Sequence, residues 1–149
     1  MNGTTHLIAG AAVGLATARY LQLPPGATVA ALAVAGGAAL APDWLQINVP
    51  GLGKTIRGVF GHRGLTHWLL TAAALYLSLR SLSQPMALAA ACGWASHIIL
   101  DAFNAPGVPA FWPLWRLRLA SFESGGWFDG VARFCAGLLA LWGAMRFIP

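Results

Sequence analysis

Five long apolar stretches dominate this sequence and constrain its fold more than any other feature. A helix needs about 17–25 apolar residues to cross the hydrocarbon core of a membrane. The stretches that meet this length are Leu7 to Leu23, Ala27 to Leu45, Leu65 to Leu82, Met86 to Phe103 and Val131 to Ile148. They predict an all-α fold, a polytopic membrane helix bundle of about five transmembrane helices.

The scarcity of charge favours this membrane bundle over the alternative, a soluble helical bundle. Charged residues make up only 9% of the chain, whereas about 25% is typical of soluble domains. The length of 149 residues fits one domain over residues 1–149, since domains typically run to about 100–200 residues. The N-terminus lacks the basic region and cleavage site of a removable signal peptide, so we expect the mature protein to begin at residue 1.

The connections between the apolar stretches carry most of the charge. The segment from Phe111 to Leu119 alternates apolar with basic residues, and its tryptophans and arginines suit the headgroup region of a membrane. It predicts an interfacial segment between the last two helices, either a membrane anchor or a lid that admits lipid. Within the first helix, Gly10 and Gly14 lie four residues apart, so a neighbouring helix can approach closely there.

The net charge of +5 does not indicate a nucleic-acid partner, because the basic residues are scattered singly between apolar runs. Basic residues instead accumulate in cytoplasmic loops of membrane proteins. Six lie in the connections at 46–64 and before the last helix, and three lie on the opposite side, Arg19, Arg80 and Arg146. This asymmetry predicts a cytoplasmic N-terminus.

The few histidines and acidic residues are not spread evenly over the two predicted membrane faces. The chain has only four histidines and four acids, and six of these eight fall on the predicted cytoplasmic side, His6, Asp43, His62, His67, His97 and Asp101. An acid at the centre of a membrane helix costs about 2.5–3.5 kcal/mol and therefore normally has a partner inside the bundle. His97 and Asp101, four residues apart, share one helix face.

Histidine and carboxylate side chains delivered by separate segments to one membrane face predict a metal centre. A hydrogen-bonded His–Asp pair without metal is the alternative for His97 and Asp101 taken alone. This mixture of imidazole and carboxylate ligands suits zinc, and one or two ions, or manganese or iron, are compatible with the same set. An open coordination position would make such a centre catalytic.

Several motifs carry a resemblance to a known family. The residues Thr5-His6, Pro42-Asp43, His62-Arg63-Gly64-x-Thr66-His67 and Gly93-x-x-Ser96-His97-x-x-x-Asp101 resemble the YdjM-like bacterial inner-membrane metal-dependent hydrolase family over about residues 4–123. The resemblance implies a multi-pass protein of the bacterial inner (cytoplasmic) membrane with a hydrolase-like metal centre. The His-x-x-x-Asp and Pro-Asp elements are also similar to those of zinc-dependent phospholipase C proteins.

The chain departs from the pattern of that family at one acid. The family commonly has Pro-Asp-x-Asp, whereas Leu45 stands here where the second acid is expected. The segment Ser121 to Gly126 resembles the late Gly/Ser-rich region of the family and contributes Glu123.

Together these features predict metal-dependent hydrolysis of an ester or phosphoester in a membrane lipid or lipid-linked substrate. Glu123 is the candidate general base, and Arg63 could hold a phosphate oxygen through its planar guanidinium. One alternative is a non-catalytic membrane protein with a structural metal site, and another is a small-solute or metal transporter. A transporter would need ionisable residues along a path through the membrane. The oligomeric state is left open.

Overall fold

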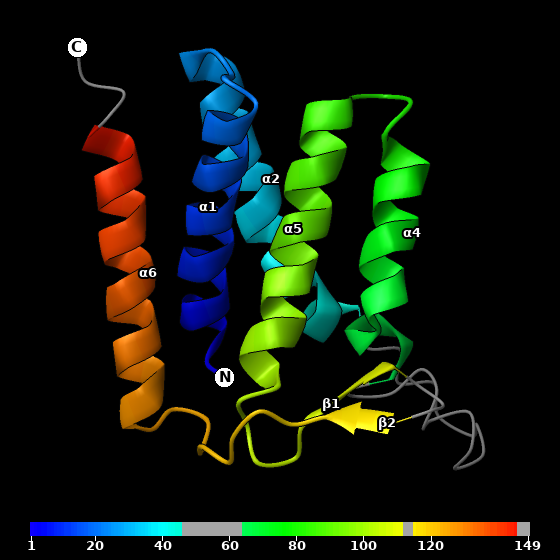
Figure 1. The fold of residues 1–149 in the computed structure, drawn as a ribbon, viewed down its shortest axis with the longest axis vertical. Coiled ribbons are helices and arrows are strands. Elements are labelled where there is room, and N and C mark those ends of the chain that lie inside the picture. Colours follow the sequence, from blue (N-terminus) through cyan, green and yellow to red (C-terminus); the bar gives the residue numbers. More distant parts are fainter. Residues whose placement is uncertain (46–63, 112–114, 146–149) are drawn as a thin grey trace.

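The computed structural model describes residues 1–45, 64–111 and 115–145 (Figure 1). Five long helices make up most of the described chain. Their bounds are α1 Gly3–Tyr20, α2 Pro25–Trp44, α4 Leu69–Leu79, α5 Gln84–Asp101 and α6 Trp127–Met145. A short 3-10 helix, η1, spans Leu65–His67 and leads into α4. Each of the five predicted apolar stretches thus overlaps one of these helices, and the third also includes η1.

Local chemistry explains where several of these helices begin. The side chain of Asn2 caps α1 by accepting a hydrogen bond from the backbone nitrogen of Thr4. Prolines stand in the first two positions of α2 and α5. Backbone N–H groups at these positions have no partner within the helix, so proline loses no hydrogen bond there. Between α1 and α2 the chain turns at Gln22, which has a positive φ of 53°.

Small residues bring α1, α2 and α5 together at the centre of the bundle. Ala18, Ala31, Ala35 and Ala89 form one buried cluster of these three helices. The α carbon of Gly93 packs so tightly on the backbone of Ala35 that a β carbon there would overlap it. In Figure 1, α6 lies beside α1 at one edge of the bundle and α4 lies beside α5 at the other. Close helix approach through glycine, predicted at Gly10 and Gly14, is confirmed.

The segment between α5 and α6 contains a small β-hairpin that the all-α prediction did not include. Strands β1, Val108–Phe111, and β2, Trp115–Leu117, pair antiparallel with Val108 opposite Leu117. After β2 the chain runs back beneath α5, where the nitrogen of Leu119 donates to the carbonyl of Ala102. The predicted interfacial segment is therefore partly a hairpin, and it lies at the same end of the bundle as the N-terminus (Figure 1).

Two of the described helices, α2 and α6, are long and apolar enough to cross a membrane. Helix α4 has eleven residues, which rise about 17 Å, well below the ~30 Å thickness of a hydrocarbon core. Helices α1 and α5 have eighteen residues each, but the polar side chains at their ends lower their hydropathy. The predicted five helices are present, and a five-span arrangement is not confirmed.

Candidate metal centre

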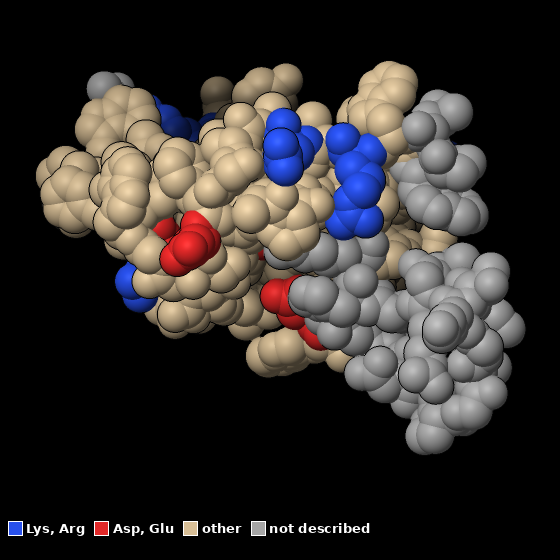
Figure 2. All heavy atoms as spheres, turned by 90° about the horizontal axis from the view of Figure 1, so that it is seen from below, with Lys and Arg blue, Asp and Glu red and all other residues tan. Residues whose placement is uncertain are grey.

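Helix ends bring five of the six predicted ligands together at one end of the bundle. His6 comes from the first turn of α1, Asp43 from the last turn of α2 and His67 from η1. His97 and Asp101 come from the last two turns of α5. In Figure 1 this is the end at which α1 begins and α5 ends, and in Figure 2, which faces that end, both acidic and basic side chains reach the surface.

The side chains form two overlapping triads whose donor atoms lie within 4.8 Å of one another. One triad is His6, Asp43 and His97, and the other is His67, His97 and Asp101. All of these side chains are buried except that of Asp43, which is 34% exposed. Asp43 is therefore the member of the cluster that solvent or another molecule can reach.

The tautomer of His97 is determined by its surroundings. Its Nδ1 lies 2.7 Å from the carbonyl oxygen of Ala39, and a carbonyl can only accept a hydrogen bond, so Nδ1 carries a hydrogen. In the neutral ring Nε2 then presents a lone pair. A hydrogen bond of this kind on the far nitrogen is what orients histidine ligands in metal sites.

That lone pair faces the ring of His67. The two Nε2 atoms lie 3.1 Å apart, and Nδ1 of His67 lies 3.1 Å from the hydroxyl oxygen of Thr66. If Thr66 donates to Nδ1, Nε2 of His67 carries a hydrogen that it can donate to His97; a metal ion bound by both Nε2 atoms would take the place of that hydrogen. The two Nε2 atoms therefore converge on one point, which a hydrogen or a metal ion can occupy.

Carboxylates surround the same point. Oδ1 of Asp43 lies 3.6 Å from Nε2 of His67 and 3.7 Å from Nε2 of His97. Oδ2 of Asp101 lies 3.7 and 3.9 Å from the same two nitrogens. Donor atoms of one zinc ion lie roughly 3–4 Å apart, because each is about 2.0–2.2 Å from the metal. These separations fit a common metal ion.

His6 completes the cluster. Its ring stacks on that of His97 with 3.9 Å between the centroids, and its Nε2 lies 3.3 Å from Oδ1 of Asp101. Its other ring nitrogen, Nδ1, is buried and makes no hydrogen bond to the described residues. A buried polar atom without a partner costs about 1–3 kcal/mol, which metal ligation would offset. The side chains present therefore fit a divalent metal ion.

The electrostatics of His67 agree with this fit. Burial by itself would lower the pKa of its imidazole, but hydrogen bonds and proximity to Asp101 and Asp43 outweigh burial and raise that pKa above its ordinary value of 6.5. The position thus stabilises a positive charge.

Three residues outside the predicted ligand set hold Asp101 or the start of α1 in place. Asn104 donates from Nδ2 to Oδ1 of Asp101 at 2.8 Å, and the amino group of Met1 lies 2.7 Å from the same oxygen. Asp129, at the start of α6, accepts hydrogen bonds from the backbone nitrogen of Asn2 and from the hydroxyl of Thr5. The sequence could have indicated the contact of Asn104 with Asp101, because the two residues lie one helical turn apart. It could not indicate the contact of Thr5 with Asp129, which joins opposite ends of the chain.

The remaining predicted site residues lie elsewhere. His62 and Arg63 fall outside the described residues. Glu123 is exposed and lines a separate small pocket with Phe122, Trp127 and Phe128. The structure does not bring it into either triad.

Fold and site together define a small helical protein with buried histidines and carboxylates gathered at one end of its bundle. The chain belongs to the YdjM inner membrane protein family, whose match extends over residues 1–148. This result confirms the resemblance found in the motifs and supports location in the inner membrane. No solved structure matches the chain.

Two relatives illustrate the similarity. The chain is 33% identical to YvsG of Bacillus subtilis (strain 168) over 138 residues, which cover 87% of this chain and 84% of YvsG. It is 40% identical to the inner membrane protein YdjM of Escherichia coli (strain K12) over 80 residues, or 46% of this chain. That alignment spans only 39% of the length of YdjM. Neither name states an activity.

Proposed function

We propose that this protein is a membrane-bound metal-dependent hydrolase that acts on an ester or phosphoester of a lipid or lipid-linked substrate. The observation that carries the proposal is the facing pair of Nε2 atoms of His67 and His97, with carboxylates around it. Zinc is the metal that this donor set suits best, with manganese or iron as alternatives. His6, Asp43, His67, His97 and Asp101 are the residues that would hold it.

The contacts of these residues indicate a different role for each. The carbonyl of Ala39 orients the ring of His97, and Asn104 orients the carboxylate of Asp101. The partly exposed Asp43 faces the side from which water and substrate arrive. A bound divalent ion would supply activation of a water molecule and polarisation of the scissile oxygen.

An apolar groove beside the cluster supports a lipid as the substrate. It has a volume of about 760 Å³, and its lining includes Trp44, Thr66, Trp68 and Trp94. Trp44 follows Asp43 in the chain, and Thr66 and Trp68 flank His67, so the groove borders the ligand-bearing segments. The indole of Trp94 donates to the carbonyl of Thr66 at 2.9 Å and holds that wall in position. An acyl or isoprenoid chain in this groove would present its polar end to Asp43.

We further infer that the protein crosses the inner membrane more than once, with the metal centre at the cytoplasmic face. Large apolar side chains on the outside of the bundle support several crossings, since Val29, Leu70 and Phe134 are each more than 60% exposed. Arg116 in β2 and Arg118 just after it lie at the same end as the cluster. Basic residues mark the cytoplasmic side of membrane proteins.

The deep burial of four of the five ligands favours one other function, a metal site that is purely structural. A closed site would bind metal and stabilise the bundle without turnover. The two functions differ in whether Asp43 leaves a coordination position open, and activity measurements distinguish them.

Elemental analysis of the purified protein tests the proposal. Wild-type protein is expected to carry one or two equivalents of a transition metal, and His97→Ala is expected to lose most of it. Removal of a residue that only hydrogen-bonds to a metal ligand weakens metal binding by about 10–100-fold. Removal of a ligand itself should have at least that effect. Ser96→Ala, which alters the residue beside His97, is the control and should keep its metal.

Turnover of phospholipids and isoprenoid phosphates is then compared for the same three proteins with and without a chelator. Metal-dependent turnover that His97→Ala lacks supports the hydrolase. Stoichiometric metal without turnover of any of these substrates identifies the structural site instead. Absence of bound metal from wild-type protein contradicts both.

A further inference from the structure

A second groove lies at the opposite end of the bundle from the metal centre, between α1 and α6. It has a volume of about 430 Å³, within the ~300–1,000 Å³ range of small-molecule sites. Apolar side chains from both helices form most of its wall, among them Ala12, Leu15, Ala16 and Leu139. Arg19 in this groove lies thirteen positions after His6 on α1, a rise of about 20 Å. The groove is therefore distinct from the metal centre.

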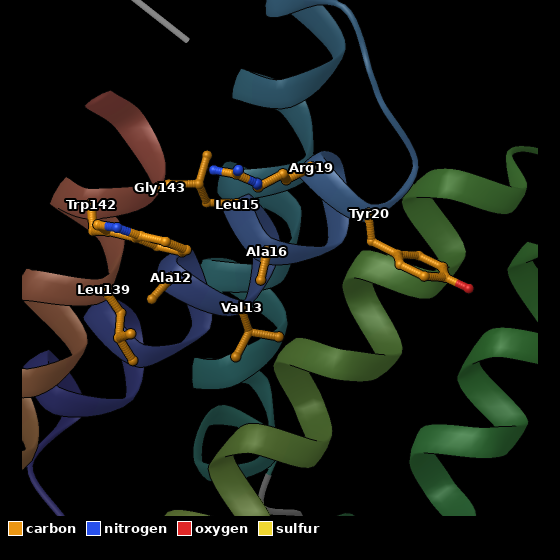
Figure 3. A pocket seen from close by; sticks show the side chains of 9 residues that line it. All are labelled: Ala12, Val13, Leu15, Ala16, Arg19, Tyr20, Leu139, Trp142 and Gly143. Atoms are coloured by element: carbon orange, nitrogen blue, oxygen red, sulfur yellow. The ribbon is translucent and has the colours of Figure 1, made fainter. Parts of the chain in front are cut away.

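One charged side chain enters this apolar groove. Arg19, in the last turn of α1, extends toward Trp142 and Gly143 of α6, whereas Tyr20 points away (Figure 3). The guanidinium carbon of Arg19 lies 5.2 Å from the ring centre of Trp142. Its Nη1 is buried and makes no hydrogen bond to any described residue. The groove thus contains a fixed positive charge with unused hydrogen-bonding capacity.

The chain offers no acidic side chain to neutralise this charge. Its four acids are Asp43, Asp101, Glu123 and Asp129. Asp43 and Asp101 end their helices at the metal centre, Asp129 begins α6 beside Asn2, and Glu123 precedes α6. Among the described residues no anionic group complements Arg19, and because a buried donor without a partner is costly, an external anion would stabilise the groove.

We propose that this groove binds an anionic phospholipid of the inner membrane, with its phosphate on Arg19 and an acyl chain between α1 and α6. The planar guanidinium can donate two parallel hydrogen bonds to a phosphate. The apolar wall matches an acyl chain, and a location in the inner membrane supplies the ligand. Gly143 is buried and packs against Leu15, so α6 approaches α1 closely at this point of the groove.

Lipid binding to purified, delipidated protein tests the proposal. Dioleoylphosphatidylglycerol and uncharged dioleoylglycerol are titrated in detergent, and bound lipid is counted by native mass spectrometry. Wild-type protein should bind phosphatidylglycerol about tenfold more tightly, the effect of one charge-assisted hydrogen bond. Arg19→Gln should abolish this preference. Arg80→Gln is the matched control, because Arg80 is an exposed arginine that follows α4 and lies outside the groove.

A second variant tests the apolar part of the groove. Ala16 is exposed and lines the groove, so Ala16→Trp should fill it and weaken binding of both lipids without disturbing the core. Circular dichroism, measured in parallel, reports whether each variant is folded.

Two outcomes would overturn the proposal. One is an unchanged preference for phosphatidylglycerol in folded Arg19→Gln. The other is a change of oligomeric mass in Ala16→Trp with unchanged lipid binding, which would identify the groove as a contact between two copies of the chain.

Discussion

His97 uses its two ring nitrogens for different purposes. Nδ1 donates to the carbonyl of Ala39, and this contact leaves Nε2 available to His67 and the nearby carboxylates. Ala39 lies four residues before Asp43 on α2, so the helix that carries one candidate ligand also orients the ring of another. A ligand atom and its orientation thus depend on the same pair of packed helices, α2 and α5.

Asp129, at the start of α6, ties the N-terminus to this helix. Removal of its carboxylate should lower the free energy of unfolding. Its carboxylate accepts from the backbone nitrogens of Asn2 and Gly125 and from the hydroxyl of Thr5. Asp129→Ala leaves these donors without an acceptor and should lower the free energy of unfolding by about 1–3 kcal/mol. Denaturation of the purified protein in detergent measures the loss.

Asp129→Asn is the matched control for that prediction. An amide oxygen can still accept both backbone N–H groups, and its NH2 group can donate to the hydroxyl of Thr5. We therefore expect most of the stability to remain. Equal stability of Asp129→Ala and wild type would contradict a structural role for this carboxylate.

At the scale of elements, the contact between α2 and α5 determines how closely the ligands approach. Gly93 lies one turn before His97 on α5, and its α carbon packs on the backbone of Ala35. Gly93→Ala would force the two helices apart at this point. We expect a loss of about 1–3 kcal/mol in the free energy of unfolding, as for other overpacked cores, together with reduced metal content.

Gly37→Ala on α2 provides the control for Gly93→Ala. A β carbon at Gly37 meets nothing within 4 Å, and alanine is favoured over glycine inside a helix by about 0.5–1 kcal/mol. This variant should be slightly more stable than wild type and keep its metal. The prediction for Gly93 fails if thermal denaturation gives both variants the same stability.

The sequence predicted the helices because each requires only a long apolar run, and it predicted the cluster because helix ends alternate between two faces of a bundle. The sequence did not predict contacts between residues that lie far apart along the chain. Thr5 and Asp129 lie 124 residues apart, and no periodicity links them. The hairpin was missed because β1 has four residues and contains Pro109, and β2 has three, too few for an alternating pattern.

The predicted number of membrane crossings is not confirmed, for a related reason. Apolar length in sequence does not distinguish a helix that crosses the membrane from one that ends early. The stretch from Leu65 to Leu82 divides into η1, the eleven residues of α4 and a terminal turn, because His67 and Thr66 are used at the cluster.

At the scale of the whole molecule, the cluster joins segments that otherwise meet only by packing small side chains. Its candidate ligands come from α1, α2, η1 and α5, so a bound metal would cross-link the bundle at one end. The opposite end has no such cross-link among the described residues, and there α6 meets α1 across the apolar groove that contains Arg19. We therefore expect bound metal to stabilise one end of the bundle and bound lipid to stabilise the other.

Metal removal should lower the stability of the entire bundle rather than of one helix. A ligand that binds only the folded state, present at about 100 times its Kd, adds ~2.7 kcal/mol to the free energy of unfolding. We expect a chelator to remove this contribution and to lower the Tm of wild-type protein as one cooperative transition followed by circular dichroism. His97→Ala should begin near the chelated Tm and respond little to the chelator. A chelator effect of equal size in both proteins would show that the stabilising metal binds elsewhere, because His97 belongs to both triads.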